Sequence, residues 1–159
     1  MRWDLVGAFE TIVPHRSSSA VRVFTGQEDF FAEHLPGAPR VPEPLLIELV
    51  AQTGGVLYGA GLDFKKEVIL AKIEETEFPA TAHPPCTLRI EAELEDEREE
   101  ASWINGTVTC GGRTVAQVRL FLVTFETLGG EGQGIVFNKG FMEHYGIRGL
   151  LAASGADHV

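Results

Sequence analysis

The segment PLLIELVAQTGGVL, residues 44–57, reads as one helix that is apolar on almost every side. Pro44 suits its first turn, because the amide that proline lacks would have no partner there. A helix that is hydrophobic all round is buried inside a protein rather than laid on its surface. We therefore expect residues 44–57 to form the centre of the fold. Glycines in and after this segment allow close packing or end the helix: Gly54, Gly55, Gly59 and Gly61.

The segments on both sides of this helix have the patterns of β-strands. Residues 87–94 alternate between apolar and polar or charged side chains, which is typical of a strand with one buried face. Residues 111–112, two glycines, suit a tight hairpin turn that needs positive φ angles. The serines at 17–19, which follow Pro14, suit another turn. The expected strands are residues 7–13, 20–25, 68–78, 87–94, 103–110 and 114–125.

This order of elements predicts an α+β fold, in which short strands precede the buried helix and long strands follow it. An antiparallel sheet wrapped around one long central helix would satisfy the pattern. The chain of 159 residues is long enough for one domain with its own core. Residues 1–126 hold all of these elements, so we expect the domain to end there.

Beyond residue 126 the composition changes. Residues 129–134, GGEGQG, read as a flexible linker, so residues 127–159 are expected to be a linker and a C-terminal extension. The extension has enough apolar side chains for a short helix that packs on the domain or on a neighbouring subunit. Its glycines favour the alternative, a loosely ordered tail. The apolar side chains are Phe137, Phe141, Met142, Tyr145, Ile147, Leu150 and Leu151.

The composition argues against several classes of function. A net charge of −10 argues against nucleic-acid binding, because phosphates call for a basic face. No apolar run reaches the roughly 18 residues of a membrane span, and the first residues do not resemble a secretory signal. Cys86 and Cys110 have neither metal-binding nor redox spacing. We therefore expect a cytoplasmic protein that binds neither nucleic acid nor membrane.

Glu48 and Gln52 are the main polar residues of the apolar helix, and their spacing puts them on one face. Burying an unpaired carboxylate costs several kcal/mol, so a buried Glu48 needs a partner, a proton or a function. Gln52 can donate a hydrogen bond that holds the Glu48 side chain. The alternative is that this face of the helix simply reaches solvent.

His34 lies in the connection that leads into this helix. Residues 27–33 can form a helical turn before it. The connection after it is a shaped loop, because proline fixes φ and removes an amide donor. Loops beside a helix N-terminus suit chemistry, since free amides and the helix dipole stabilise developing negative charge there. A lone histidine is otherwise more often a structural residue. The prolines of the loop are Pro36, Pro39, Pro42 and Pro44.

Residues 34–48, HLPGAPRVPEPLLIE, resemble the signature of the β-hydroxyacyl-ACP dehydratases. That signature runs His-Phe-Pro-Gly-x-Pro-x-x-Pro-Gly and continues into a leucine-rich helix that carries Glu or Asp. His34 and Glu48 have the separation that the family gives its histidine and its acid. Residues 51–55, AQTGG, match the Ala-Gln and small-residue run of the family, and the similarity extends over roughly residues 5–125.

The resemblance implies a hot-dog fold and an obligate homodimer, or a hexamer built as a trimer of dimers. His34 of one subunit would face Glu48 of the other. His34 would take the α-proton of a 3-hydroxyacyl thioester on ACP or CoA, and Glu48 would protonate the leaving hydroxyl. The thioester carbonyl would lie against the amides of Gly37 and Glu43, with Gln52 also in the substrate site. The trans-2-enoyl product would serve fatty-acid or related lipid or polyketide synthesis, and no metal or other cofactor is implied.

Two departures from the signature leave other functions open. Leu35 replaces the usual phenylalanine, and Glu43 replaces a glycine whose amide faces the substrate carbonyl. Glu43 brings negative charge near a developing oxyanion, and a residue before proline favours extended conformations. One alternative is a hot-dog thioesterase that uses Glu48 to activate water without needing His34. The other is a protein that binds acyl thioesters without catalysis.

Overall fold

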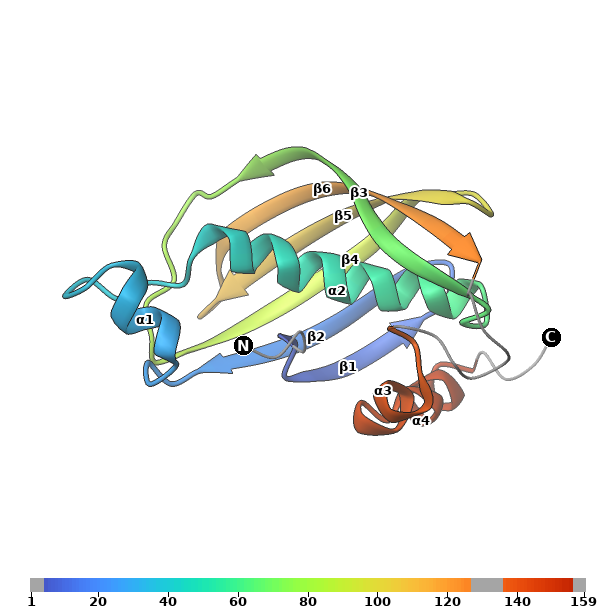
Figure 1. Ribbon diagram of the computed structural model, residues 1–159, viewed down its shortest axis with the longest axis horizontal. Helices are drawn as coiled ribbons and strands as arrows, with labels where there is room; N and C mark the ends of the chain where they lie inside the picture. The colour runs from blue at the N-terminus through green and yellow to red at the C-terminus, as the bar shows by residue number, and fades with distance from the viewer. Residues whose placement is uncertain (1–4, 127–135, 156–159) are drawn as a thin grey trace.

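The computed structural model describes residues 5–126 and 136–155. In this part of the chain a long helix, α2 (Glu43–Gly61), lies inside a six-stranded sheet that curls around it (Figure 1). All neighbouring strands of the sheet are antiparallel. The predicted α+β class and the sheet wrapped around a central helix are therefore confirmed. The strands are β1 (Ala8–Val13), β2 (Ser17–Phe24), β3 (Lys66–Glu77), β4 (Cys86–Glu97), β5 (Ala101–Cys110) and β6 (Arg113–Glu126), in the spatial order β1-β2-β4-β5-β6-β3.

α2 continues past residue 57, its predicted end, because its glycines serve close packing rather than termination. A Cβ atom on Gly54 would lie only 2.7 Å from Cγ2 of Ile104 in β5. Gly106 makes the same close approach from the sheet, because a Cβ atom there would overlap Val50 of the helix. A glycine on each element thus lets the helix and sheet backbones lie close together.

The predicted turn at residues 17–19 is wrong, because these serines form the start of β2. The turn lies at residues 14–16 instead. Residues 17–19 pair with β1 on one side and with β4 on the other. Ser18 also donates a hydrogen bond to the carbonyl oxygen of Thr53 in α2, at 3.0 Å. Pairing on both sides, together with this contact, outweighs the turn preference of serine.

The other predicted elements agree well with the structure. The boundaries of β1 and of β3 to β6 differ from the predicted ones by three residues or fewer at either end. The β5–β6 hairpin turns at Gly111 and Gly112, whose φ angles of 57° and 78° confirm the predicted need for glycine. The helical turn predicted at residues 27–33 is α1 (Asp29–His34), which includes the histidine.

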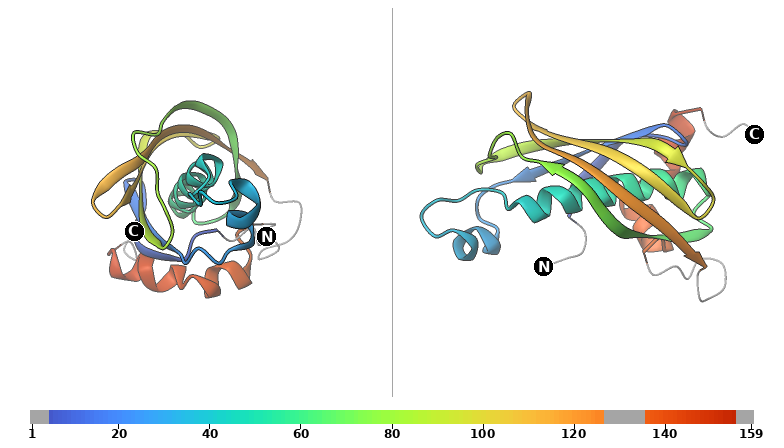
Figure 2. Two further views of the ribbon diagram at one scale, coloured as in Figure 1. Left: turned by 90° about the vertical axis from the view of Figure 1, so that its left-hand side faces the viewer. Right: turned by 90° about the horizontal axis from the view of Figure 1, so that it is seen from above.

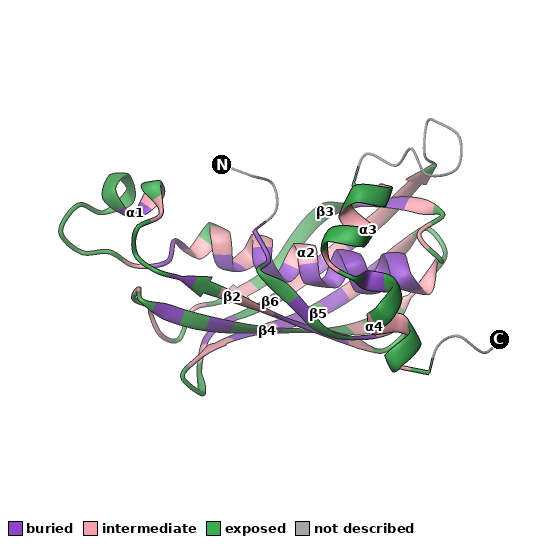
Figure 3. Ribbon diagram, turned by 90° about the horizontal axis from the view of Figure 1, so that it is seen from below, coloured by how far each residue is buried: buried purple, intermediate pink, exposed green. Residues whose placement is uncertain are grey.

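The two halves of α2 differ in burial (Figure 3). Its second half, from Thr53 to Ala60, is buried without interruption. Its first half has buried leucines on one side, whereas the other side stays partly open. The half-exposed or exposed residues on that open side include Pro44, Ile47, Glu48, Ala51 and Gln52. The helix therefore offers an accessible face near its N-terminus and none in its second half.

Two short helices, α3 (Lys139–His144) and α4 (Ile147–Ala153), pack beside the rest of the fold (Figure 2). α4 lies against β1, and Ile147 is fully buried. Phe137 packs on the second half of α2, where it would contact a Cβ atom on Gly59. For residues 136–155 the structure therefore shows the packed alternative for the extension. The predicted linker, residues 129–134, lies outside the described residues, and the domain boundary at residue 126 stays a prediction.

Among the described residues, no helix is both long enough and apolar enough to cross a membrane.

Candidate active site

The open face of α2 presents Glu48 and Gln52 together, as their spacing predicted. Nε2 of Gln52 donates a hydrogen bond of 2.8 Å to Oε1 of Glu48, which confirms the predicted contact. Both residues are half-exposed. The carboxyl group of Glu48 is therefore neither fully buried nor freely solvated, the two alternatives that the sequence left open.

The N-terminal segment of the chain fixes the amide group of Gln52. Its Oε1 atom accepts hydrogen bonds from the backbone amides of Leu5, at 3.1 Å, and Val6, at 3.2 Å. Because only the oxygen end of an amide side chain accepts hydrogen bonds, these donors turn Nε2 toward Glu48. No hydrogen bond reaches Oε2 of Glu48 from the described part of the chain, so Oε1 alone is held there. No sequence pattern predicted these two hydrogen bonds, because backbone amides leave no signature in the sequence.

His34 is the last residue of α1, and it is exposed. Aromatic packing anchors α1, since the ring of Phe31 lies 5.7 Å from that of Phe24 and 4.5 Å from that of Phe30. Together with the loop that follows, α1 projects past the end of the sheet (Figure 1, Figure 2). Within the described residues of one chain, no hydrogen bond or ion pair joins His34 to Glu48. The hydrogen bonds and ion pairs of a single chain therefore do not link the predicted pair, within the residues that the structure describes.

The two amides predicted to bind the thioester carbonyl lie in the loop after α1 and at the start of α2. Within residues 5–126 and 136–155, the amides of Gly37 and Glu43 donate no hydrogen bond. Gly37 is exposed and has a φ of 80°. Glu43 is the first residue of α2, where helix amides lack partners inside the helix.

The side chain of Glu43, which departs from the glycine of the signature, has a cationic partner. Nη2 of Arg40 lies 3.5 Å from Oε1 of Glu43, with the two side chains 37% and 33% exposed. The expectation that Glu43 is extended before Pro44 is wrong. The amide of Leu45 bonds to the carbonyl oxygen of Pro42, at 3.0 Å, and closes the first helical turn over Glu43. Arg40 thus offsets part of the negative charge at the start of the helix.

Residues 5–126 and 136–155 contain no cluster of three or more His, Cys, Asp or Glu side chains suited to a metal ion. Cys86 and Cys110 are free thiols on the neighbouring strands β4 and β5. Burial raises the pKa of Cys86 to about 11, so its thiol stays protonated at neutral pH. The absence of a metal or cofactor from the reaction stays a prediction.

Several dehydratases are similar in sequence to this chain over most of its length. A family model described as a FabA-like domain matches residues 17–119. The 3-hydroxyacyl-[acyl-carrier-protein] dehydratase FabZ of Caulobacter sp. (strain K31) is 29% identical over 126 residues, or 77% of each chain. The FabZ of Rickettsia rickettsii (strain Sheila Smith) is 30% identical over 115 residues, which cover 71% of this chain and 79% of the relative.

Solved structures share the fold at lower identity. The dehydratase heterocomplex ApeI:P from Xenorhabdus doucetiae matches with a TM-score of 0.65 at 17% identity, over 78% of this chain and 84% of that one. The PaaI protein of the Escherichia coli phenylacetic acid degradation operon matches with a TM-score of 0.61 at 12% identity, over 74% and 78%. A hypothetical thioesterase with coenzyme A from Streptococcus pneumoniae TIGR4 matches with a TM-score of 0.58 at 10% identity, over 74% of this chain and 84% of that one.

The curled sheet around a central helix is a hot-dog fold, as these structural neighbours show. Within that class, the signature at residues 34–48 and the matching relatives agree. The chain belongs to the β-hydroxyacyl-ACP dehydratase family, a family of enzymes. The resemblance found in the sequence is therefore confirmed for family and fold, whereas the roles of individual residues are proposals.

Proposed function

We propose that this protein dehydrates 3-hydroxyacyl thioesters, carried on ACP, to trans-2-enoyl thioesters in fatty-acid or related lipid synthesis. His34 takes the α-proton, and Glu48 delivers a proton to the leaving hydroxyl, which departs as water. The observation that carries the proposal is the held carboxyl group of Glu48. Its Oε1 is fixed by Gln52 on the accessible face of an otherwise apolar helix, and its Oε2 is available.

We also propose that each site is built from two subunits of a homodimer, alone or within a trimer of dimers. Helix α1, which ends at His34, projects past the end of the sheet (Figure 1), and no hydrogen bond or ion pair joins His34 to Glu48 within the described part of one chain. The edge strand β3 carries exposed apolar side chains, Ile69, Leu70 and Ile73, which are 48%, 37% and 47% exposed. An unpaired apolar edge strand favours pairing with another chain. A second copy of this chain would provide that partner and would bring a second His34.

The available amides of Gly37 and Glu43 support a site for the thioester carbonyl. Backbone N–H groups directed at an oxygen that gains negative charge stabilise the transition state. The Glu43 carboxylate, which would oppose that charge, is paired with Arg40. The proposed chemistry needs no metal or redox cofactor, because the two side chains move both protons. Cytoplasmic location remains a prediction.

The test is hydration of a trans-2-enoyl thioester, the reverse reaction, followed by loss of absorbance of the conjugated thioester. His34→Ala and Glu48→Gln are each expected to abolish most of the activity. Mixing the two inactive variants after unfolding and refolding is expected to restore part of it. A mixed dimer regains one intact site only if His34 and Glu48 come from different chains.

Four results would contradict parts of this proposal. Full activity in both variants would remove His34 and Glu48 from the mechanism. No recovery in mixed dimers of confirmed composition would place the pair within one chain. Release of free thiol from acyl-CoA that depends on Glu48 alone would instead indicate a thioesterase, and binding of acyl thioesters without turnover would indicate a protein without catalysis.

A further inference from the structure

The C-terminal extension reaches Glu48 through a chain of hydrogen bonds. The hydroxyl of Tyr145, just after α3, donates to the carbonyl oxygen of Val6 at 3.0 Å. The amide of Val6 donates to Oε1 of Gln52 at 3.2 Å, and Nε2 of Gln52 donates to Oε1 of Glu48 at 2.8 Å. Tyr145, residues 5–6 and Gln52 thus form a path of hydrogen bonds that ends at the carboxyl group of Glu48.

The segment that joins Tyr145 to Gln52 is short and buried. Leu5 is 6% exposed and Val6 is 3% exposed. The amide of Gly7 donates to the carbonyl oxygen of Val21 at 2.9 Å, which ties the segment to β2. Tyr145 holds the other side of the same peptide group, through the carbonyl oxygen of Val6. A buried carbonyl oxygen without a donor is unfavourable, so removal of this hydroxyl loosens the segment.

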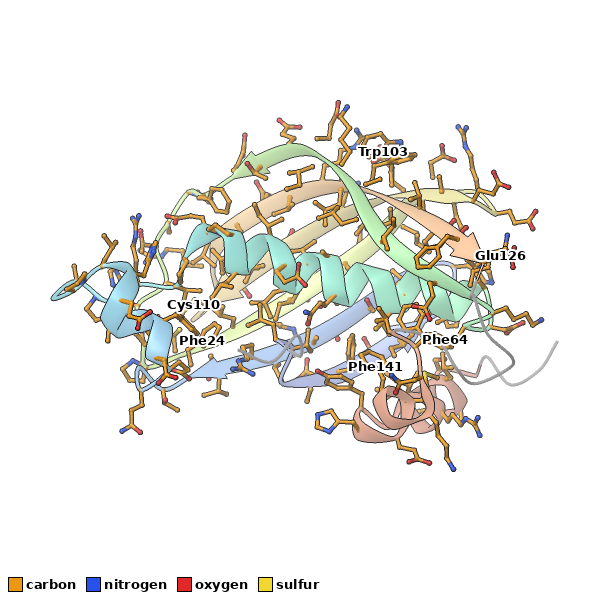
Figure 4. The ribbon with its side chains drawn as sticks, in the orientation of Figure 1. Phe24, Phe64, Trp103, Cys110, Glu126 and Phe141 are labelled. Carbon is orange, nitrogen blue, oxygen red and sulfur yellow. The ribbon has the colours of Figure 1, made fainter. Side chains whose placement is uncertain are left out.

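Aromatic contacts fix the position of Tyr145 independently of its hydroxyl group. Its ring centroid lies 5.1 Å from that of Phe9, edge-on, and 4.9 Å from that of Phe141. The ring of Phe141 in turn lies 5.8 Å from that of Phe137, which packs on Phe64 just after α2. Figure 4 labels Phe64 and Phe141. Tyr145→Phe therefore removes the hydrogen bond and leaves the ring contacts in place.

We propose that Tyr145 is a positioning residue for Glu48, so that the C-terminal extension takes part in building the active site. The inference rests on the proposed role of Glu48 as the acid. Fixed amides at Leu5 and Val6 orient Gln52, which holds Oε1 of Glu48 and leaves Oε2 for proton transfer. Without the Tyr145 hydroxyl, Val6 moves more freely and Glu48 spends less time in the reactive orientation.

The test compares Tyr145→Phe with Tyr58→Phe in the full-length protein. Tyr58 is a matched control, because its hydroxyl also donates to a backbone carbonyl, that of Arg98 at 2.6 Å, but lies outside this chain of contacts. Tyr145→Phe is expected to lower kcat for enoyl-thioester hydration about three- to tenfold, the effect of one hydrogen bond, with KM little changed. Tyr58→Phe is expected to leave kcat unchanged.

A double-mutant cycle shows whether Tyr145 acts through Gln52. In a Gln52→Ala background, Tyr145→Phe is expected to lower kcat no further, since the connection is already broken. An equal loss in both backgrounds would mean that Tyr145 acts by another route and would overturn the inference. An unchanged kcat in Tyr145→Phe alone would overturn it as well.

Hydrogen exchange at the amides of Leu5 and Val6 tests the connection without catalysis. Tyr145→Phe is expected to speed their exchange, whereas Tyr58→Phe is not. If the wild-type protein does not hydrate enoyl thioesters, the proposed function fails. Faster exchange in Tyr145→Phe would then still support the link to Gln52, and unchanged exchange would overturn the inference.

Discussion

The first and second halves of α2 belong to one continuous helix but meet different surroundings. The first half carries Glu48 and Gln52 on a face that remains accessible. The second half, Thr53 to Ala60, is enclosed by the sheet and by the C-terminal extension. Its polar side chains are satisfied internally, since Thr53 donates to the carbonyl oxygen of Leu49 and Tyr58 to that of Arg98.

This difference shows how a small fold can place a carboxyl group accurately and still leave it accessible. The enclosed half cannot shift without disturbing the core, so it fixes the axis of the helix. The open half then presents its side chains at set positions along that axis. A group that takes part in chemistry needs both a rigid support and an approach for the substrate.

The largest expected effect is loss of activity on changing the open half. Glu48→Gln is expected to slow enoyl-thioester hydration by on the order of 10²- to 10⁴-fold, as for loss of a general acid. Its free energy of unfolding is expected to change by less than about 1 kcal/mol, because the side chain is half-exposed and keeps its shape. Steady-state kinetics and urea denaturation measure the two effects. A large loss of stability would show that Glu48 is mainly structural.

A charged side chain on β3 should separate the two subunits of the proposed dimer. Ile73→Lys is expected to shift the protein toward monomer and to lower hydration activity at least about tenfold, because a lysine on an edge strand opposes pairing. Val23→Lys is the control, since Val23 is also an exposed apolar residue, at 55%, but lies on β2. Sedimentation velocity reports the oligomeric state. A fully active Ile73→Lys monomer would contradict the two-subunit site.

In the enclosed half, an added methyl group should destabilise the protein at Gly54 but not at Gly55. Gly54→Ala is expected to lower the free energy of unfolding by about 1–3 kcal/mol, because its Cβ atom would press on Ile104. Gly55→Ala is expected to raise it by up to about 1 kcal/mol, since its Cβ atom would lie 4.0 Å from Val68 and alanine favours a helix. Urea denaturation of both variants measures the contrast, and equal effects would mean that the helix is not tightly packed there.

Alkaline pH should destabilise the enclosed half through Tyr58. Burial, and then the nearby carboxylates of Glu97, Glu100 and Glu99, raise the pKa of Tyr58 to about 12 from its ordinary 10.0. The hydroxyl therefore ionises more easily in the unfolded chain, so its contribution is complete below pH 10 and falls between about pH 10 and 12. Tyr58→Phe is expected to cost about 1 kcal/mol at neutral pH and to flatten the alkaline fall. Unfolding curves measured across this pH range test this. If Tyr58 were not responsible, the free energy of unfolding would fall equally in the wild-type protein and in Tyr58→Phe.

The smallest expected effect concerns the charge at the start of the open half. Arg40→Gln leaves Glu43 unpaired beside the proposed carbonyl site and is expected to lower kcat/KM by up to about fivefold, in line with a partly exposed ion pair. Glu43→Gln is expected not to lower it. The difference should shrink as salt is added, because exposed charges are screened. A larger loss in Glu43→Gln would mean that its carboxylate helps the reaction.

The sequence was informative where a pattern is local. The apolar run at residues 44–57, the glycines of the β5–β6 hairpin and the signature at residues 34–48 each predicted a feature that the structure or the relatives confirm. The Glu48–Gln52 hydrogen bond also followed from local spacing along one helix. Predictions of this kind succeed because the residues that decide them are close together in the chain.

Features that depend on distant partners were harder to predict. The serines at 17–19 are typical of a turn, and only pairing with β1 and β4 makes them a strand. The hydrogen bond from Tyr145 to Val6 joins residues 139 positions apart, and a backbone acceptor has no residue type to signal it. The packing of the extension was left open for the same reason. The approach of His34 to Glu48 is harder still, because it is proposed to involve two chains.

The bond between Tyr145 and Val6 also has a consequence for the order in which the protein matures. During translation His34 and Glu48 leave the ribosome well before Tyr145 does, and the N-terminal part of a chain begins to fold first. The hydrogen bonds that orient Gln52 therefore lack their outer support until residue 145 has been synthesised. A chain that stops before residue 145 would contain the proposed acid and base but would hold the acid loosely, so the proposed activity would depend on the segment that follows β6.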